Sequence, residues 1–197
     1  MTTGLDARAA YELWADAYPP VAHNPVMRAE QSIVEPMLLR TRSARALDVG
    51  TGSGRYLPVL RAAGARTVIG IDFSERMLRS APSFRRVRAD ARELPFRKGA
   101  FDLVNASLMV GDITDLRAWM SEIARVLALG GQLVYSDFHP VWAENGWRRT
   151  FRTAAGAEHE VAIAHHAIEE HLEALEAAGL THVAVREPRL KDADDPA

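Results

Sequence analysis

The sequence predicts an α/β fold built on a doubly wound, mainly parallel sheet. Short apolar segments alternate along the chain with segments whose apolar residues recur at helical spacing. A glycine-rich connection at residues 47–54 lies between an apolar strand and a helix, which is typical of a tight strand-to-helix turn. With 197 residues, of which 48% are hydrophobic, the chain is long enough to form one domain with its own core.

The first 40 residues are predicted to be helical. Residues 6–18 form a candidate amphipathic helix, and the prolines at 19–20 end it. Pro25 can open a second helix, because proline suits a first helical turn, and Pro36 is expected to kink or interrupt that helix. Both helices precede the strand–helix alternation and are therefore placed outside it.

Residues 41–190 are predicted to contain the strand–helix alternation. Pro58 suits the first turn of a helix, Ser74 can cap the next one, and Gly64 and Gly179 stand where helices end. The expected strands lie at 46–49, 67–71, 101–104, 132–136 and 180–186, and the expected helices at 55–63, from 74 onward, at 116–127 and at 168–178.

Residues 47–54 (LDVGTGSG) are the most informative segment of the chain. The glycines at 50, 52 and 54 let the backbone approach a ligand closely, and free N–H groups at the start of the next helix face that ligand. Asp72 ends the second strand, where a carboxylate can accept hydrogen bonds from both hydroxyls of a ribose. A glycine turn and a ribose-binding acid together indicate a nucleoside cofactor.

The spacing of the glycines favours S-adenosylmethionine (SAM) over a dinucleotide. The dinucleotide fingerprint has its third glycine at the position of Arg55, and the charge of Asp48 repels a pyrophosphate. SAM has no phosphate, and its ammonium and sulfonium groups suit an acid and nearby carbonyl oxygens. The alternatives are an NAD-dependent oxidoreductase and a turn that holds no ligand.

Further segments extend this pattern in order: 72–78 (DFSERML), 88–96 (RADARELPF), 101–104 (FDLV), and 122–127 (EIARVL) followed by Gly130 and Gly131. With them the chain resembles the class I SAM-dependent methyltransferases, and more narrowly the small-molecule branch that includes the ubiquinone/menaquinone C-methyltransferases and many natural-product methyltransferases. The resemblance implies methyl transfer to an O, N or C atom of a small molecule in quinone or natural-product biosynthesis, with S-adenosylhomocysteine (SAH) as product. The alternative is a non-catalytic SAM-binding scaffold, against which the acids Asp48, Asp72 and Asp90 argue.

The resemblance and the chemistry of SAM together assign the cofactor roles. Asp72 binds the ribose, and the backbone near Gly50 and Gly52 holds the methionine part. Phe73 and Met77 sandwich the adenine, with plain core packing as the alternative. Asp90 accepts from the adenine amine, unless it is a surface turn acid, and the Ala91 N–H donates to the ring. The predicted cofactor-binding residues are Asp48, Gly50, Thr51, Gly52, Gly54, Asp72, Phe73, Met77, Asp90, Ala91, Asn105, Ser107 and Leu108.

The family architecture also implies a lid over the methyl group. It divides the chain into a helical lid segment at 1–40, a SAM-binding α/β domain at 41–190 with a substrate-cap insertion at 138–166, and a charged tail at 191–197. The lid segments concentrate aromatic residues, which suits a flat or apolar small molecule. The predicted substrate and lid residues are Tyr11, Trp14, Tyr18, His23, Trp142 and Trp147.

His139 is the predicted catalytic base if the acceptor must lose a proton. It follows the fifth strand, and histidine titrates near neutral pH. The alternatives are a structural loop histidine and catalysis by alignment of the acceptor alone. His165 and His166 either line the same cavity or pack against a hairpin, and the pair does not predict a metal site.

Composition limits the partners and the compartment. A net charge of −2 without a basic block predicts no nucleic-acid partner, and no apolar stretch approaches the roughly 18 residues that span a bilayer. Without cysteine or a leader segment, a cytoplasmic protein is expected. No seventh strand is recognisable, unlike in the family, and an open sheet edge predicts pairing with another chain, such as a homodimer.

Overall fold

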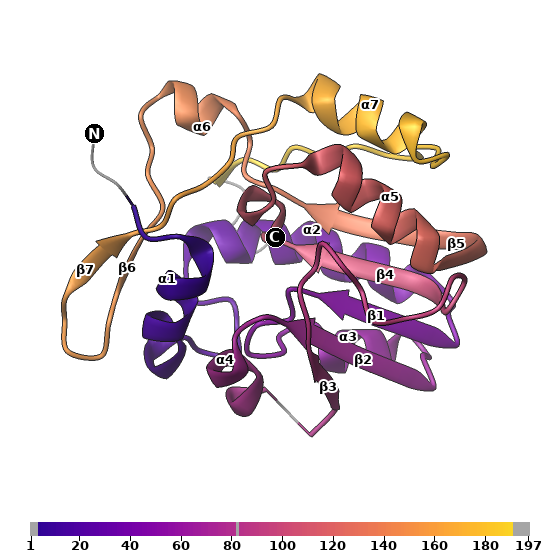
Figure 1. Ribbon diagram of the computed structural model, residues 1–197, viewed down its shortest axis with the longest axis horizontal. Helices are drawn as coiled ribbons and strands as arrows, with labels where there is room; N and C mark the ends of the chain where they lie inside the picture. Colours follow the sequence, from indigo (N-terminus) through magenta and orange to yellow (C-terminus); the bar gives the residue numbers. More distant parts are fainter. Residues whose placement is uncertain (1–3, 82, 191–197) are drawn as a thin grey trace.

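The structure is a computed structural model that describes residues 4–81 and 83–190. Its centre is a parallel sheet with the strand order β3-β2-β1-β4-β5 (Figure 1), so the predicted doubly wound α/β fold is confirmed. The strands are β1 (Arg45–Val49), β2 (Thr67–Asp72), β3 (Arg85–Arg88), β4 (Phe101–Ser107) and β5 (Leu127–Ser136), and a separate hairpin pairs β6 (Thr150–Arg152) with β7 (Glu158–Glu160).

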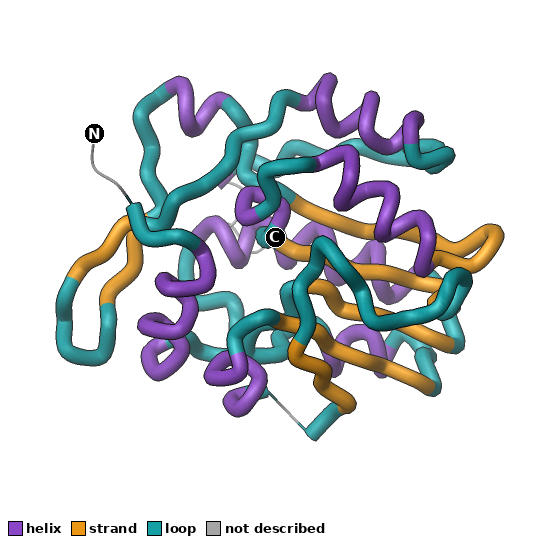
Figure 2. The backbone as a smooth tube through the Cα atoms, in the orientation of Figure 1, coloured by secondary structure: helices purple, strands orange, loops and turns teal. Residues whose placement is uncertain are grey.

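Helices cover both faces of the sheet (Figure 2). In the described part of the chain, none is long and apolar enough to cross a membrane. The helices are α1 (Ala7–Trp14), α2 (Pro25–Arg40), α3 (Leu57–Ala62), α4 (Glu75–Ser80), α5 (Leu116–Val126), α6 (Val141–Glu144) and α7 (Ile168–Ala177), with the 3-10 turns η1 (Ala15–Ala17) and η2 (Val110–Asp112).

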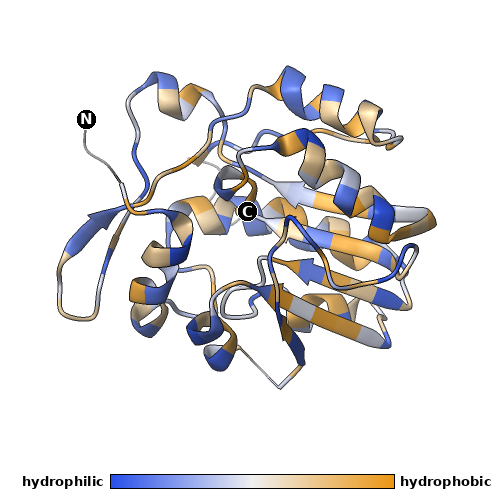
Figure 3. Cartoon of the chain, in the orientation of Figure 1, coloured by the Kyte–Doolittle hydropathy of each residue, from blue (hydrophilic) through white to orange (hydrophobic). Residues whose placement is uncertain are grey.

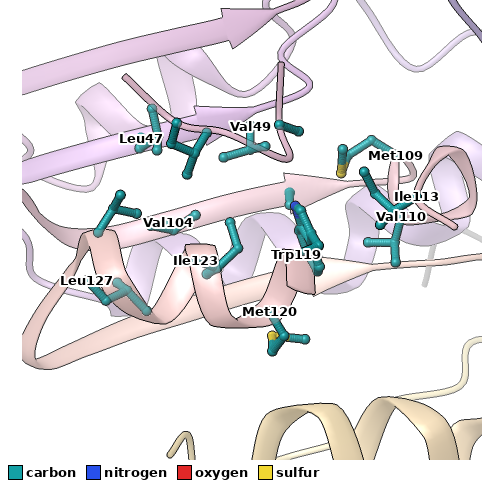
Figure 4. Close-up of a cluster of buried hydrophobic side chains, with 14 of the residues drawn as sticks. Leu47, Val49, Val104, Met109, Val110, Ile113, Trp119, Met120, Ile123 and Leu127 are labelled. Atoms are coloured by element: carbon teal, nitrogen blue, oxygen red, sulfur yellow. The ribbon is translucent and has the colours of Figure 1, made fainter. Parts of the chain in front are cut away.

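Strand β1 shows how one sheet serves two apolar cores. Leu47 and Val49 belong to the core on the α5 side, where they join Trp119 and Ile123 (Figure 4), whereas Ala46 belongs to the core with α2 and α3. Successive side chains of a strand point to opposite faces, so a strand between two helix layers is apolar on both. The central strands are accordingly mostly hydrophobic (Figure 3).

Helix α2 begins as predicted but does not break where expected. Pro25 occupies its first turn, and the Asn24 side chain accepts a hydrogen bond from the Met27 N–H at 2.9 Å. The helix runs unbroken through Pro36, so the expected interruption is wrong. The turn after Pro36 is fixed by the fully buried Leu38, and this packing outweighs the backbone hydrogen bond that proline removes.

Helix α5 passes directly into β5, without the loop that the sequence predicts. The strand begins at Leu127 and not at Gln132. The pairing with β4 shifts register here, because Phe101 is opposite Leu127 whereas Leu103 is opposite Gln132. Residues 128–131 therefore form an irregularity of β5. It lies at the amino end of β4, which is the opposite edge of the sheet from the carboxyl ends of the strands.

The segment after β5 folds back onto the amino terminus. Leu5 donates a hydrogen bond to the Glu160 carbonyl and accepts one from the Ala162 N–H, each at 2.8 Å. The β6–β7 hairpin consequently lies beside α1 (Figure 1), and Phe151 of the hairpin shares a small apolar cluster with Ala10 of α1. Two segments that are distant in the sequence, 4–24 and 138–166, therefore form one structural unit.

The strand predicted at 180–186 is wrong. These residues have no regular secondary structure, and Val183 is 94% exposed. Alternating apolar residues stabilise a strand only when one face is buried, and here neither face is. Among the described residues the sheet ends at β5, and the predicted charged tail at 191–197 lies outside the described residues.

Candidate functional site

The carboxyl ends of β1, β2 and β4 border a cavity of about 410 Å³, to which α1 also contributes wall residues. This is the edge at which open α/β sheets bind ligands. The structure brings most predicted residues to this cavity: its lining includes Tyr11, Tyr18, Asp48, Gly50, Thr51, Gly52, Asp72, Phe73, Met77, Asp90, Ala91, Ser107 and Leu108.

The glycine turn after β1 has the backbone shape that glycine favours. Gly50 and Gly52 have φ angles of 64° and 53°, in the left-handed region. A Cβ at Gly52 would meet no atom within 4 Å, so this side of the turn is open to the cavity. A Cβ at Gly50 would lie 2.8 Å from Cγ of Met109. Gly54 has a φ of 86° and shapes the same turn, but it does not line the cavity.

Asp72 joins the tip of β2 to the glycine turn. Its carboxylate accepts hydrogen bonds from the Gly52 N–H at 2.9 Å and from the Ser74 N–H at 2.8 Å. Burial raises the pKa of Asp72 to about 6, although these two hydrogen bonds favour the charged form. Each carboxylate oxygen keeps a second lone pair, so Asp72 can still accept hydrogen bonds from a ligand in the cavity.

Asp48 is held in place by donors on neighbouring elements. It accepts hydrogen bonds from Oγ1 of Thr51 at 2.6 Å and from Nδ2 of Asn105 at 2.7 Å. Ser107 in turn donates to the Asn105 amide oxygen at 3.2 Å. Burial raises the pKa of Asp48 to about 6. Asn105, which the sequence assigns to the cofactor, does not line the cavity; its observed contact is the positioning of Asp48.

Apolar and charged residues meet at the β2–β3 end of the cavity. Phe73 and Met77 line it, and the guanidinium carbon of Arg8 lies 5.5 Å from the centre of the Phe73 ring. Asp90 pairs with Arg92 at 2.6 Å and with Arg8 at 3.8 Å. The hydrogen bond from Arg92 lowers the pKa of Asp90, so this acid is ionised at neutral pH.

A buried polar cluster that the sequence did not reveal lies beside the glycine turn. Glu30 of α2 accepts hydrogen bonds from the Tyr56 hydroxyl at 2.7 Å and from Ser136 Oγ at 2.9 Å, and its Oε2 lies 2.9 Å from Arg55 Nη2. Arg55 and Tyr56 line the cavity. The one sequence signal for this cluster is Arg55, which stands at the position of the third fingerprint glycine and also argues against NAD.

A second cluster without a sequence signal joins residues of the segments 4–24 and 138–166, which the sequence predicts to form a lid. Arg149 donates a hydrogen bond to Asp112, and the guanidinium carbon of Arg149 lies 5.6 Å from the centre of the Tyr11 ring. Asp112 and Tyr11 line the cavity. Burial raises the pKa of Asp112, and the nearby charge of Arg149 opposes that shift.

The predicted lid aromatics divide into two groups. Tyr11 and Tyr18 line the cavity, while Trp14 and His23 pack behind them, with ring centres 4.9 Å and 5.1 Å from Tyr18. The other two predicted residues, Trp142 and Trp147, do not line the cavity. Their ring centres are 5.0 Å apart, and both rings pack against Phe138 in a separate cluster.

The structure does not bring the predicted base His139 to the cavity. Its side chain is 38% exposed, its Nδ1 accepts from the Val141 N–H at 3.2 Å, and its Nε2 lies 3.9 Å from Glu187. His166 is buried and lies 2.7 Å from the Ile113 carbonyl oxygen, as expected of a packing residue. Within residues 4–81 and 83–190, no group of acids and histidines could hold a metal ion.

Comparison with known proteins assigns the family. The sequence profile of the family described as Methyltransferase domain matches residues 47–135, from β1 into β5. A phosphatidylethanolamine N-methyltransferase of Cereibacter sphaeroides is 33% identical over 144 residues, which cover 66% of this chain and 67% of that protein. The chain belongs to the class I SAM-dependent methyltransferases.

Other relatives of this methyltransferase agree with that family. A demethylmenaquinone methyltransferase of Thermus thermophilus is 38% identical over 114 residues, and the chain spans about half of its length: the match covers 53% of this chain and 51% of that protein. A solved SAM-dependent methyltransferase from Mesorhizobium loti superposes with a TM-score of 0.62 at 25% identity, over 77% of this chain and 80% of that one. The cofactor of the family is SAM, so the predicted cofactor is confirmed and is preferred over NAD.

Proposed function

We propose that this methyltransferase binds SAM in the cavity and transfers its methyl group to an O, N or C atom of a small-molecule acceptor. The observation that supports this most is Asp72, whose buried carboxylate is held by the N–H groups of Gly52 and Ser74. It stands beside the open side of the glycine turn, and two hydrogen bonds already fix its orientation. A ribose that fills this space finds a preorganised acceptor for its hydroxyls.

The remaining cofactor roles follow from the order of groups along the cavity. Phe73 directly follows β2 and Met77 lies on α4, whereas the glycine turn follows the neighbouring strand β1. Both side chains line the cavity and would take the adenine between them. Asp90 and Ala91 line the same cavity, where the Asp90 carboxylate would accept from the adenine amine and the Ala91 N–H would donate to the ring. The turn itself offers N–H and carbonyl groups to the methionine part, and the positive charge of Arg55 lies close by for its carboxylate.

The acceptor is determined by the part of the chain that the family profile does not cover. The relatives' names specify demethylmenaquinone and phosphatidylethanolamine, which are different molecules, whereas the profile of the methyltransferase domain matches residues 47–135 here. This segment contains the cofactor side of the cavity. From the segment 4–24, Tyr11 and Tyr18 line the cavity, and the segment 138–166 packs behind them through Phe151. These two segments select the acceptor, which we place in quinone or natural-product biosynthesis.

Positioning is the main catalytic task of these residues. When bound, SAM supplies a methyl group on a sulfonium, and displacement of that leaving group needs no proton. The aromatic faces of Tyr11 and Tyr18 shield positive charge and exclude water. Where the acceptor has to lose a proton, Asp112 is better placed to accept it than His139, because only Asp112 lines the cavity.

Calorimetric titration tests the proposed cofactor, and product analysis tests the reaction. SAM and SAH are expected to bind saturably in the micromolar range, and NAD is expected not to bind. Release of SAH in the presence of a panel of small-molecule acceptors then reports methyl transfer. A micromolar NAD isotherm would contradict the cofactor, and SAM binding without turnover on any acceptor would indicate the scaffold alternative.

A further inference from the structure

Arg149 is a buried cation whose hydrogen-bonding capacity is mostly unused. Its side chain is 6% exposed, and Nη2 donates to Asp112, but Nε and Nη1 have no hydrogen-bond partner among the described residues. A guanidinium has five N–H donors, of which one lies on Nε and two on Nη1. Burying donors of a charged group without acceptors is costly, so a buried arginine of this kind calls for a ligand that accepts from it.

The position of Arg149 connects it to the acceptor side of the cavity. It directly precedes β6, in the segment outside the matched residues 47–135. Two of its side-chain partners, Asp112 and Tyr11, line the cavity. Arg149 therefore stands immediately behind the cavity wall.

Aromatic rings cover the guanidinium on the cavity side and on the lid side. Its carbon lies 5.6 Å from the ring centre of Tyr11 and 5.8 Å from that of Phe138. A ring over a guanidinium stabilises the cation without satisfying its N–H donors. Of the two rings only Tyr11 lines the cavity, so a ligand there reaches Nε and Nη1 when the Tyr11 ring moves aside, and that ring can then lie against a flat ligand.

We propose that Arg149 is an anion-binding residue of the acceptor site, and that the acceptor is a small, flat molecule with a carboxylate group. Guanidinium and carboxylate match in charge and in planar geometry, so the carboxylate takes the free donors while Asp112 keeps Nη2. This inference rests on the proposed function, because it names the class of acceptor for the same site. The same chemistry would also suit the methionine carboxylate of SAM, and the experiment separates the two.

The probe pair is benzoate and benzamide, which share a flat ring and differ in charge. Protein saturated with SAH is titrated with each probe, and the unfolding midpoint and the calorimetric isotherm are measured. In the wild type we expect saturable stabilisation by benzoate and none by benzamide. Arg149→Met should weaken benzoate binding at least tenfold, and the control Arg148→Met, which removes an exposed arginine paired with Glu160, should leave it unchanged.

Loss of Arg149 alone leaves Asp112 buried and unpaired, so a second variant guards against misfolding. Asp112→Asn combined with Arg149→Met removes both charges and is expected to fold, to bind SAH and to lack benzoate binding. Benzoate binding that persists in this variant, a wild type that takes benzamide as well as benzoate, or the lack of a saturable benzoate effect would each overturn the proposal.

Titration with SAM in the absence of benzoate and benzamide distinguishes a carboxylate of the acceptor from the methionine carboxylate of SAM as the ligand of Arg149. An Arg149→Met variant that binds SAM as the wild type does supports the acceptor carboxylate, whereas a tenfold loss of SAM affinity would assign Arg149 to the cofactor and overturn the inference. Failure of the proposed function is visible separately, as a wild type that does not bind SAM at all. The benzoate titration repeated without SAH still reports on Arg149 in that case.

Discussion

Glu30 and Arg55 form a buried ion pair at 2.9 Å that joins α2 to the turn on which the cofactor is proposed to bind. The same carboxylate accepts from Tyr56, the next residue of that turn, and from Ser136 at the end of β5. One side chain of the amino-terminal segment thus holds together the turn and the carboxyl end of the last strand. Glycine restricts its own backbone little, so contacts of this kind, together with the hydrogen bond from Gly52 N–H to Asp72, determine the shape of the turn.

Removal of this anchor should destabilise the fold. Glu30→Ala leaves the guanidinium of Arg55 buried without its partner and should lower the free energy of unfolding by about 3–5 kcal/mol. Denaturant titration measures the change. The double variant Glu30→Leu/Arg55→Leu removes both charges and should recover much of the loss, because no unpaired charge remains. A single variant within 1 kcal/mol of the wild type would show that the pair is not an anchor.

The Asp72 side chain should be worth a factor of roughly 10 to 150 in SAM affinity. Asp72→Ala removes the acceptor for the ribose hydroxyls, and hydrogen bonds to a charged group contribute about 1.5–3 kcal/mol. Calorimetric titration measures the loss. Asp102→Ala is the matched control, since Asp102 is an acid at the amino end of β4 that pairs with Arg45 at 2.6 Å, away from the cavity. Equal affinity of the Asp72 variant and the wild type would refute the ribose assignment.

The cofactor side of the site could be predicted from the sequence because its parts are local. The glycine turn directly follows β1 and Asp72 is the last residue of β2, and parallel strands bring their carboxyl ends to one edge of the sheet. Side chains that must meet there are fixed by the strand positions alone. Asn105 was placed at the same edge for this reason, although its contact is with Asp48 and not with the cavity.

The lid side could not be predicted because its contacts depend on how distant segments fold onto each other. Arg149 donates a hydrogen bond to Asp112, which lies 37 residues earlier in the sequence, and no local sequence pattern predicts that contact. His139 lies three residues beyond the end of β5, in a loop where its ring accepts from the Val141 N–H and does not line the cavity. The strand expected at 180–186 has the right alternation but no surface to pack on. Pairing of the open β5 edge with another chain stays a prediction.

Two glycines of the turn should respond differently to the same substitution. Gly52→Ala places a Cβ in open space of the cavity, so it should cost about 1–2 kcal/mol for the left-handed backbone while obstructing SAM. Gly50→Ala has the same backbone cost and adds a clash with Met109 at 2.8 Å, so it should be the less stable variant. Unfolding curves and SAM titration measure both effects. The idea fails if Gly52→Ala binds SAM normally.

The pH dependence of binding should follow the protonation of Asp72. Burial raises the pKa of Asp72 to about 6 from an ordinary value of 3.8. Protonation would occupy one of the two lone pairs that the Gly52 and Ser74 N–H groups leave available for a ribose, so SAM affinity should fall as the pH is lowered through 6. Calorimetric titrations between pH 5 and pH 8 measure this. Asp72→Asn keeps the shape of the side chain without a titrating proton, so its affinity should be lower at pH 8 and should vary less with pH.

The contribution of Asp72 to the stability of the ligand-free protein should fall as the pH rises, whereas its contribution to SAM binding should grow. The folded pKa of Asp72 is higher than the unfolded one, so the folded state binds more protons between pH 4 and pH 6, and the contribution of this group is lost as the pH rises through about 6. Acids with lowered pKa, such as Asp90 and Asp102, act in the reverse direction, but they are present in both the wild type and Asp72→Asn. The difference between these two proteins isolates Asp72. Asp72→Asn should gain stability relative to the wild type from pH 4 to pH 7, by an amount on the order of 2 kcal/mol. Parallel stability curves for the two proteins would mean that Asp72 is not held in a desolvated site.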